Sequence, residues 1–317
     1  MNTHPSLSQH RTPRWWWPLA LLIALAVPSV AQAADLVVEK DVVYGEVGDY
    51  KLKLDVYRQA APNTEANNEA NAAAPTLHPA VNAVHGGAWR GGSKSEFAGI
   101  CQGLANLGYV AFSVDYRLLT KTTNKWPVQI NDVQRAVRWV RANAAKYGVD
   151  PNRIGALGAS AGGHLVALLG TTDTRDNSDP ALADYSSRVN CVVDIFGPTD
   201  FTVTPAEGGM SQLAVSLVLD FLGKTPEEAP DIYRDASPIT HIDKKTVPFL
   251  IFHGTADPLV PLDQSQRFYE ALQKAEIEAT FIKFEGEGHG FQKPENIAKM
   301  IETTRAFLEK HLGDKPM

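Results

Sequence analysis

The segment Gly158-Ala159-Ser160-Ala161-Gly162 has the residue types and spacing of a nucleophilic serine. The pattern G-x-S-x-G places a serine on a sharp turn between a strand and a helix, where its hydroxyl is exposed. The flanking glycines leave room for the close backbone contacts of such a turn, and the dipole of the helix that follows favours negative charge developing beside the serine. The pattern therefore predicts that Ser160 attacks a carbonyl carbon. The alternative interpretation is a turn of small residues that serves packing alone.

A second glycine-rich segment, His85-Gly86-Gly87-Ala88-Trp89, follows another predicted strand. A turn of this kind can point backbone N–H groups at a carbonyl oxygen that becomes an oxyanion. We expect Gly87 and Ala88 to be two of these donors, and Ala161, next to the serine, to be the third. An ordinary glycine turn is the alternative.

Nine histidines are available as the base that would activate the serine, and we expect it to be His289. This residue lies in the glycine-flanked loop 286–291, after the last predicted strand, from which an imidazole could reach the serine. His164 lies one helical turn beyond the serine and faces the same side, but it would approach the hydroxyl from within the helix. His85 is expected to orient the segment 86–89, the oxyanion segment, through its ring nitrogens. His253 is expected to make a structural hydrogen bond.

The acid that orients the histidine should follow a strand and precede the histidine in the chain. Asp257 meets this requirement, just after the predicted strand 249–253, and is the expected residue. Asp200 follows the preceding strand and is its competitor. Asp263, with Gln266 three residues later, is interpreted as a helix N-cap.

Strand and helix patterns alternate along most of the chain, which predicts a mostly parallel sheet with helices on both faces. Apolar residues at steps of three and four, from Ile130 to Tyr147, mark the buried face of one helix. We expect a single catalytic domain over residues 34–317, a surface loop at 59–76 and a possible lid in the irregular segment 199–247. Strands are expected at residues 36–44, 50–57, 80–85, 110–114, 153–157, 191–196, 249–253 and 279–284.

Residues 1–33 have the pattern of an export signal. Arg11 and Arg14 precede an apolar run at residues 15–27, and Ala31-Gln32-Ala33 supplies the small residues of a cleavage site. The apolar run is shorter than the roughly 20 residues of a membrane span. We therefore expect a protein that is exported to the periplasm or secreted, without a stable membrane anchor once the signal is cleaved.

Charge and cysteine content narrow the expected partners and cofactors. The net charge is -6, and it becomes -8 once residues 1–33, which hold two arginines and no acid, are set aside. An acidic surface repels phosphate backbones, so no nucleic acid partner is expected. Cys101 falls in a predicted helix and Cys191 opens a predicted strand, so we expect two separate buried thiols. We find no metal-ligand cluster and expect no metal or organic cofactor.

Five motifs in order resemble the α/β-hydrolase superfamily, and more narrowly exported carboxylesterases of the hormone-sensitive-lipase and bacterial feruloyl-esterase type. Two positions depart from that pattern: Ala88 stands where a third glycine is frequent, and Ala159 where an acidic residue is frequent. Ala88 would keep its donor role if its φ is negative, and Ala159 favours the feruloyl- and acetylxylan-esterase side. The matching motifs are His85–Trp89, Asp115-Tyr116-Arg117-Leu118, Gly158–His164, Gly254–Pro261 and Gly288-His289-Gly290-Phe291.

The resemblance implies an α/β-hydrolase fold and hydrolysis of short-acyl or aryl esters, with acetyl or feruloyl esters of polysaccharide among the candidates. Trp89 and Phe291 flank the predicted catalytic residues and are expected to form an apolar acyl wall; packing aromatics are the alternative. An amidase or peptidase could use the same triad. A non-catalytic binding module on a hydrolase scaffold is a further alternative.

Overall fold

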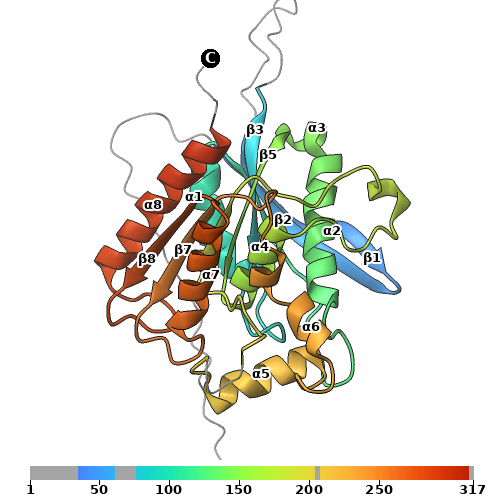
Figure 1. The fold of residues 1–317 in the computed structure, drawn as a ribbon. Coiled ribbons are helices and arrows are strands. Elements are labelled where there is room, and N and C mark those ends of the chain that lie inside the picture. Colours follow the sequence, from blue (N-terminus) through green and yellow to red (C-terminus); the bar gives the residue numbers. More distant parts are fainter. Residues whose placement is uncertain (1–34, 61–75, 204–207, 314–317) are drawn as a thin grey trace, which may run out of the picture.

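The computed structural model describes residues 35–60, 76–203 and 208–313. Strands and helices alternate in the order expected from the sequence (Figure 1). The strands are β1 Leu36–Val47, β2 Tyr50–Gln59, β3 His78–Val84, β4 Val110–Val114, β5 Val149–Ala159, β6 Val192–Ile195, β7 Phe249–Gly254 and β8 Ala279–Phe284. The α-helices are α1 Ala98–Asn106, α2 Val128–Ala142, α3 Ala144–Tyr147, α4 Ala161–Thr171, α5 Gln212–Leu222, α6 Pro230–Asp235, α7 Leu262–Lys274 and α8 Pro294–Leu312. Short 3₁₀ helices occupy Lys94–Phe97, Pro180–Leu182 and Pro238–His241.

The strands form one eight-stranded sheet in the order β1-β2-β4-β3-β5-β6-β7-β8. The β1–β2 hairpin and the β2–β4 pair are antiparallel, and the other neighbours are parallel. The mostly parallel sheet expected from the sequence is thus confirmed. Gly48, with a φ of 55°, makes the hairpin turn in a conformation that glycine adopts without strain.

The sheet register places the two glycine-rich segments beside each other. Val84, at the end of β3, pairs with Gly158 near the end of β5, and Gly158 pairs on its other side with Asp194 of β6. Carboxyl ends of parallel strands share one edge of a sheet, where open α/β folds build their sites. The segments after β3 and β5 therefore leave the sheet side by side.

Alternation along the inner strands divides the core into two layers. In β7, Phe249 and Ile251 pack on the face covered by α2, α4 and α7, while Leu250 and Phe252 pack on the face covered by α1 and α8. This two-residue period on fully buried strands is the expected behaviour of a sheet covered on both faces. Cys101 and Cys191 lie in the second layer as free, buried thiols, as predicted.

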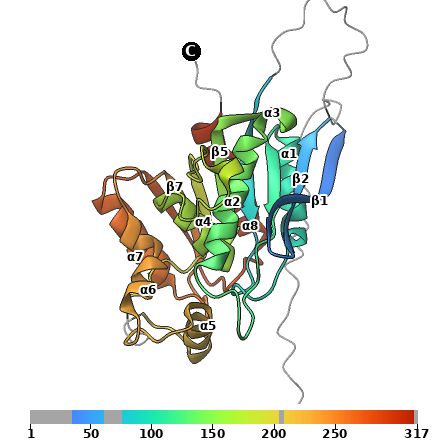
Figure 2. The ribbon, with the colours of Figure 1, turned by 90° about the vertical axis from the view of Figure 1, so that its right-hand side faces the viewer.

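The segment 199–247 is not irregular, because it contains helices α5 and α6. The hydroxyl of Ser211 accepts a hydrogen bond from the N–H of Ala214 (3.2 Å) at the start of α5, and Gly223, with a φ of 76°, ends it. Figure 2 shows α5 and α6 next to each other at one end of the sheet. Helix α5 has no single apolar face in the sequence, because its apolar residues face both the cavity and the body of the protein.

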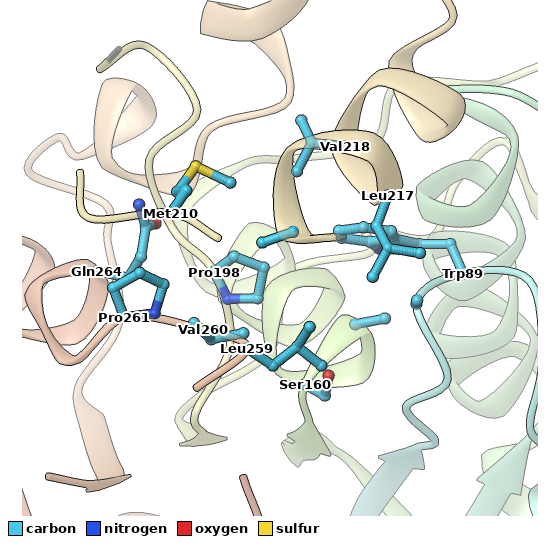
Figure 3. A pocket seen from close by; sticks show the side chains of 13 residues that line it. Trp89, Ser160, Pro198, Met210, Leu217, Val218, Leu259, Val260, Pro261 and Gln264 are labelled. Atoms are coloured by element: carbon cyan, nitrogen blue, oxygen red, sulfur yellow. The ribbon is translucent and has the colours of Figure 1, made fainter. Parts of the chain in front are cut away.

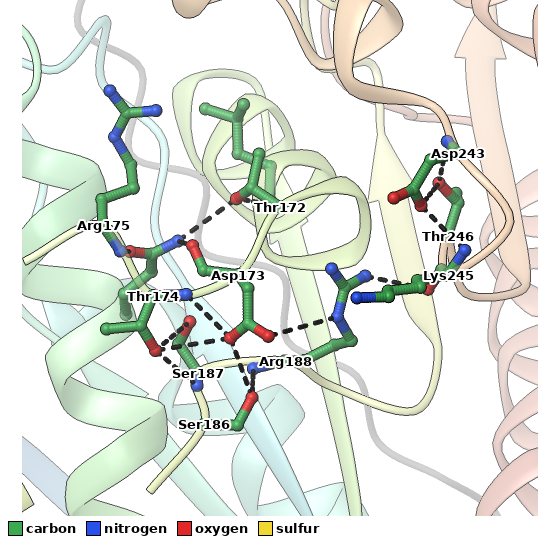
Figure 4. A network of polar contacts seen from close by, with 12 residues as sticks. Thr172, Asp173, Thr174, Arg175, Ser186, Ser187, Arg188, Asp243, Lys245 and Thr246 are labelled. Atoms are coloured by element: carbon green, nitrogen blue, oxygen red, sulfur yellow. Dashed lines mark hydrogen bonds and ion pairs between the residues drawn. The ribbon is translucent and has the colours of Figure 1, made fainter. Parts of the chain in front are cut away.

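The connection between α4 and β6 has little regular structure but is held by a polar network (Figure 4). Oδ1 of Asp173 accepts hydrogen bonds from the hydroxyl of Ser186 (2.9 Å) and the N–H of Thr174 (2.8 Å), and Oδ2 lies 3.8 Å from Nε of Arg188. Arg188 in turn donates to the carbonyl of Lys245 (2.8 Å), just before β7. The network ties this connection to the sheet away from the serine.

Two expectations lie outside the described residues: the export signal at 1–33, and nearly all of the surface loop at 59–76. Within the described ranges, none of the helices combines the length and the apolar character that a bilayer crossing requires.

Candidate active site

Ser160 occupies the turn between β5 and α4 in a strained backbone conformation. Its φ is 55° and its ψ is -121°, a region that residues with a side chain rarely adopt. A Cβ at Gly162 would lie 2.0 Å from the carbonyl oxygen of Val84, and one at Gly158 would lie 2.4 Å from that of Gly162. The two glycines are therefore sterically required, and they allow the serine to stand at the edge of the sheet.

Ser160, His289 and Asp257 form one hydrogen-bonded line. Nδ1–H of His289 donates to Oδ2 of Asp257 at 2.7 Å, and the serine Oγ lies 2.9 Å from Nε2 of the same ring. Because the carboxylate accepts at Nδ1, the neutral ring presents an acceptor to the serine hydroxyl. The three residues expected from the sequence are thus brought together in the geometry of a nucleophile, a base and an orienting acid.

The carboxylate of Asp257 is buried and surrounded by N–H donors. Oδ1 accepts from the backbone of Leu259 (2.8 Å) and Val260 (2.9 Å), while Oδ2 faces His289 and, at 3.4 Å, Nε2 of His253. Burial alone would raise the pKa of Asp257, but the hydrogen bonds from His253 and His289 outweigh it and hold that pKa well below its usual range. The acid therefore stays ionised.

The competing carboxylate, Asp200, is engaged elsewhere. Nη1 of Arg267 donates to its Oδ2 at 2.7 Å, and the backbone and hydroxyl of Thr202 donate to its Oδ1. The N-cap interpretation of Asp263 is wrong, because Pro261 holds the N-cap position of α7 and Asp263 pairs with Nε of Arg267 (2.6 Å). Because Arg267, 67 residues further along the chain, pairs with Asp200, the triad acid is Asp257 and not Asp200.

The loop that carries His289 is held by a buried residue that the sequence interpretation overlooked. Glu287 accepts hydrogen bonds from the backbone of Gln292 (3.0 Å) and Lys293 (2.9 Å) and from the side chain of Asn296 (2.8 Å). A carboxylate just before a helix start complements the free N–H groups there. The position of this acidic residue, seven residues before α8, is the sequence feature from which its role could have been predicted.

The oxyanion segment follows β3 with three successive positive φ angles: 104° at Gly87, 50° at Ala88 and 59° at Trp89. The condition of a negative φ at Ala88 is not met, because the tight turn is closed by hydrogen bonds from Arg90 and Gly91 to the carbonyl of Gly87. In the described part of the chain, none of the hydrogen bonds uses the N–H of Gly87, Ala88 or Ala161. These three N–H groups therefore have no hydrogen-bond partner among the described residues, and that of Ala88 is free despite the positive φ.

His85 and Tyr116 support the oxyanion segment through hydrogen bonds and ring stacking. Its Nδ1 is 2.8 Å from the carbonyl oxygen of Gly86, and its ring stacks on Tyr116 with 4.4 Å between centroids. The hydroxyl of Tyr116 donates to the carbonyl of His85 (3.1 Å). Burial lowers the pKa of His85 to about 4, so the ring is neutral near pH 7.

His164 is not placed to act as a base. It is fully buried, with Nε2 2.7 Å from the carbonyl oxygen of Ala236 and Nδ1 accepting from the indole N–H of Trp89 at 3.1 Å. Burial lowers its pKa to about 4. Both ring nitrogens are thus committed to connecting α4, the oxyanion segment and the end of α6.

A small apolar cavity, with a volume of about 40 Å³, opens above Ser160. Figure 3 shows Trp89, Leu217 and Val218 on one side, Met210 and Pro261 on the other, and the serine at its base. The amide of Gln264 also faces the cavity region, but its oxygen accepts from the N–H groups of Thr199 and Asp200 and its nitrogen donates to the carbonyl of Asp200. The complete lining is Ala88, Trp89, Ser160, Ala161, Pro198, Met210, Ala214, Leu217, Val218, Leu259, Val260, Pro261 and Gln264, with no charged side chain.

Of the two aromatics expected to form an acyl wall, Trp89 lines this cavity and Phe291 does not. Phe291 is buried and packs edge-to-face against Phe196 (5.3 Å between centroids) and Phe284 (4.7 Å). Phe291 is therefore a core residue although it lies close to His289 in the sequence, because the chain turns back into the core after His289. Among the described residues, no three His, Cys, Asp or Glu side chains gather as metal ligands would.

A mostly parallel eight-stranded sheet, covered on both faces and with a serine on the turn between a central strand and its helix, defines the α/β-hydrolase class. The BD-FAE family model matches residues 68–272, and the chain belongs to this family. The resemblance expected from the sequence is confirmed.

Individual relatives agree with this assignment. Esterase LipC of Mycobacterium tuberculosis is 34% identical over 255 residues, which cover 79% of this chain and 59% of the relative. The propionate-bound structure of a thermophilic esterase from Thermogutta terrifontis superposes with a TM-score of 0.70 at 30% identity, covering 90% of this chain and 97% of the other. A truncated carbohydrate esterase from gut microbiota gives 0.72 at 29% identity, covering 90% and 99%. The chain spans about three fifths of the length of the curated esterases it matches.

Proposed function

We propose that this protein is a serine carboxylester hydrolase that cleaves short-acyl or aryl esters through an acyl-enzyme. The observation that carries the proposal is the line from Ser160 through His289 to Asp257, with contacts of 2.9 and 2.7 Å. Membership of the BD-FAE family and likeness to solved esterases support it.

In acylation, Oγ of Ser160 attacks the ester carbonyl carbon while Nε2 of His289 takes its proton. Asp257 remains ionised and stabilises the imidazolium that forms. The tetrahedral intermediate then collapses: the bond from carbon to the alcohol oxygen breaks, and His289 returns the proton to the leaving alcohol. Water, activated by the same imidazole, attacks the acyl-serine and releases the acid.

The three free N–H groups of Gly87, Ala88 and Ala161 are proposed to hold the oxyanion. Their value lies in being fixed before the charge develops, so that little reorganisation is needed in the reaction. The hydrogen bonds of His85 and Tyr116 beneath the segment supply that rigidity. Loss of one such donor costs about 10² to 10³ in kcat.

The substrate class follows from the cavity. Its lining is apolar and uncharged, which favours an uncharged acyl group of modest size. The Thermogutta terrifontis esterase has been solved with propionate and with butyrate, and the gut microbiota neighbour is a carbohydrate esterase. Acetyl or feruloyl esters of polysaccharide are therefore included among the proposed substrates.

The central test uses a fluorophosphonate probe and the variant Ser160→Ala. Structures of the Thermogutta terrifontis esterase carry organophosphate adducts, which supports the choice of probe. We expect the wild type to be labelled and to hydrolyse p-nitrophenyl acetate, and the folded Ser160→Ala variant to do neither. Ser178→Ala, on an exposed loop, is the control and should behave as wild type. Retained hydrolysis in Ser160→Ala would exclude the mechanism, and a folded wild type that neither reacts nor hydrolyses would favour a binding module.

Matched ester and amide substrates with the same acyl group separate an esterase from an amidase or peptidase. We expect kcat/KM to be far higher for the ester, because the alcohol leaves more readily than an amine. A p-nitrophenyl series from acetyl to octanoyl, together with methyl ferulate, then grades the acyl group. Faster hydrolysis of the amide than of the ester would contradict the proposal.

We also propose that residues 1–33 direct export, on the basis of their charge and apolar pattern. Cell fractionation and N-terminal sequencing of the full chain expressed in bacteria test this. The expected result is an extracytoplasmic protein that begins at Ala34. A cytoplasmic protein that retains residues 1–33 would contradict it.

A further inference from the structure

A second histidine lies against the acid of the proposed triad. His253 is the fifth residue of β7 and is fully buried, with no exposed surface. Its Nε2 is 2.9 Å from the carbonyl oxygen of Val260 and 3.4 Å from Oδ2 of Asp257. Its Nδ1 is 2.7 Å from Oγ of Ser265 on α7. The sequence interpretation gave this residue a structural hydrogen bond only.

These contacts define where the protons of the ring lie. A carbonyl oxygen can only accept, so Nε2 of His253 carries a hydrogen that points at Val260, and Oδ2 of Asp257 lies beside that N–H group at 3.4 Å. In the neutral ring, Nδ1 is then the acceptor and the hydroxyl of Ser265 donates to it. Ser265 is also fully buried, so the imidazole is held in one orientation by α7 on one side and the turn after β7 on the other.

The oxygen that faces His253 is the one that His289 uses. Oδ2 of Asp257 receives Nδ1–H of His289 at 2.7 Å, while Oδ1 is occupied by two backbone N–H groups. Val260 is also engaged twice, since its N–H donates to Asp257 and its carbonyl accepts from His253. His253 thus contacts the carboxylate directly and also contacts the turn 257–260 that holds it.

We propose that His253, oriented by Ser265, is a positioning residue that holds the Asp257 carboxylate in place for His289. The inference rests on the proposed function, because it assigns His253 to the same triad. Three N–H groups donate to the carboxylate, and the N–H of His253 is a fourth positive group beside Oδ2. Removing His253 leaves Oδ2 with one donor, so the carboxylate can tilt and its charge is concentrated on His289.

The ionisable groups that face His253 are few. Asp257 and His289 lie on the site side, and Asp194 of β6 interacts with His253 electrostatically from within the sheet. Asp194 is fully buried, and burial raises its pKa to about 6. Loss of His253 should strengthen the interaction of Oδ2 with Nδ1–H of His289, because that oxygen is then no longer shared between two rings.

The test compares His253→Phe, which removes the donor but fills the space, with His253→Gln, whose amide can replace Nε2–H. Ser265→Ala removes only the orienting hydroxyl. The control is His78→Gln, since His78 also contacts a backbone carbonyl (Gly108, 3.0 Å) but lies at the opposite end of the strands. Each variant is measured for kcat, KM, the pH profile of kcat/KM and thermal unfolding.

We expect His253→Phe to lower kcat about 10- to 100-fold, as for a small displacement of a reacting group, with KM nearly unchanged. Its pH profile of kcat/KM should differ from that of wild type. His253→Gln should recover much of kcat, Ser265→Ala should fall between the two, and His78→Gln should match wild type. A folded His253→Phe variant with the kcat and pH profile of wild type would overturn the proposal. Equal losses in the Phe and Gln variants, in proportion to their thermal destabilisation, would also overturn it.

A readout that needs no turnover separates this proposal from the proposed function. The Nδ1–H proton of His289 can be followed by NMR in the Ser160→Ala background, which carries out no hydrolysis under the mechanism above. We expect its chemical shift to change in His253→Phe and not in His78→Gln. An unchanged resonance would reject the positioning role even if ester hydrolysis is established. A changed resonance, together with a wild-type protein that hydrolyses no ester, would retain the contact and reject the function.

Discussion

The indole ring of Trp89 stacks on the phenyl ring of Phe221, with 4.0 Å between centroids and 6° between the ring planes. Trp89 belongs to the oxyanion segment after β3, and Phe221 lies near the end of α5. The stack is reinforced by an ion pair from Arg90 to Asp220 at 2.6 Å. The helix that covers the cavity is therefore attached directly to the segment that is proposed to bind the oxyanion.

Replacing Phe221 by Ala should destabilise the protein substantially. Phe221 is fully buried and also packs against Trp126 and His164, so truncation leaves a cavity where three rings meet. We expect the free energy of unfolding to fall by about 3 to 5 kcal/mol, measured by urea denaturation. Leu213→Ala, on the same helix but 62% exposed, should change it by less than about 0.5 kcal/mol. Similar losses in the two variants would mean that α5 is not anchored by this stack.

The choice between the two candidate acids is tested by the pair Asp257→Asn and Asp200→Asn. An amide at position 257 would no longer stabilise the imidazolium and would favour the wrong tautomer, so kcat should fall about 10³- to 10⁴-fold. Asp200→Asn breaks the contact with Arg267 on the outside of the site, and kcat should stay near that of wild type. Steady-state kinetics with p-nitrophenyl acetate is the measurement. Comparable losses from both variants would contradict the assignment of Asp257 alone.

Two glycines near the proposed catalytic residues differ in what they tolerate. A Cβ at Gly158 would lie 2.4 Å from the carbonyl oxygen of Gly162, whereas one at Gly288 would meet only Cδ of Pro258, at 4.0 Å. We expect Gly158→Ala to lower the free energy of unfolding by about 3 kcal/mol or more, since the turn must open to admit the methyl group. Gly288→Ala should be close to wild type in stability and activity. Thermal unfolding and kcat check both, and a well-tolerated Gly158→Ala would show that the turn is less tight than its geometry requires.

His164 makes stability depend on pH in a defined direction. Its pKa is about 4 in the folded protein against an ordinary value of 6.5. Below pH 6.5 the unfolded chain binds a proton that the buried ring does not, so stability falls by about 3 kcal/mol as the pH drops towards 4, and it is unaffected above that window.

The variant His164→Gln isolates this contribution. Its amide can still donate to the carbonyl of Ala236 and accept from the indole of Trp89, but it does not titrate. Urea unfolding at about pH 7.5 and about pH 4 should show the variant gaining about 3 kcal/mol relative to wild type on acidification. His85, which acts in the same direction, and Asp194, which acts in the opposite one, are present in both proteins and cancel. A difference that does not vary with pH would contradict the prediction.

Several features of this protein follow from its sequence alone, because they depend on residues close together in the chain. Apolar runs between glycine turns predicted every strand of the sheet, and β4 and β8 have the same limits in the structure. The turn at Ser160 and the glycine-flanked loop of His289 could be recognised in the same way, since each needs only a few neighbours to define its backbone.

Other features depended on contacts between distant segments. Arg267 pairs with Asp200 and leaves Asp257 to His289, Phe291 turns into the core, and Ala88 adopts a positive φ because of the turn that follows it. Helix α5 was not predicted from the sequence, and its position depends on the packing of Phe221 against Trp89. The position of His253 against Asp257 likewise requires β7, its turn and α7 together. Local pattern determined which residues could react, whereas tertiary packing decided which partner each one meets, because burial and hydrogen-bond distance belong to the folded chain.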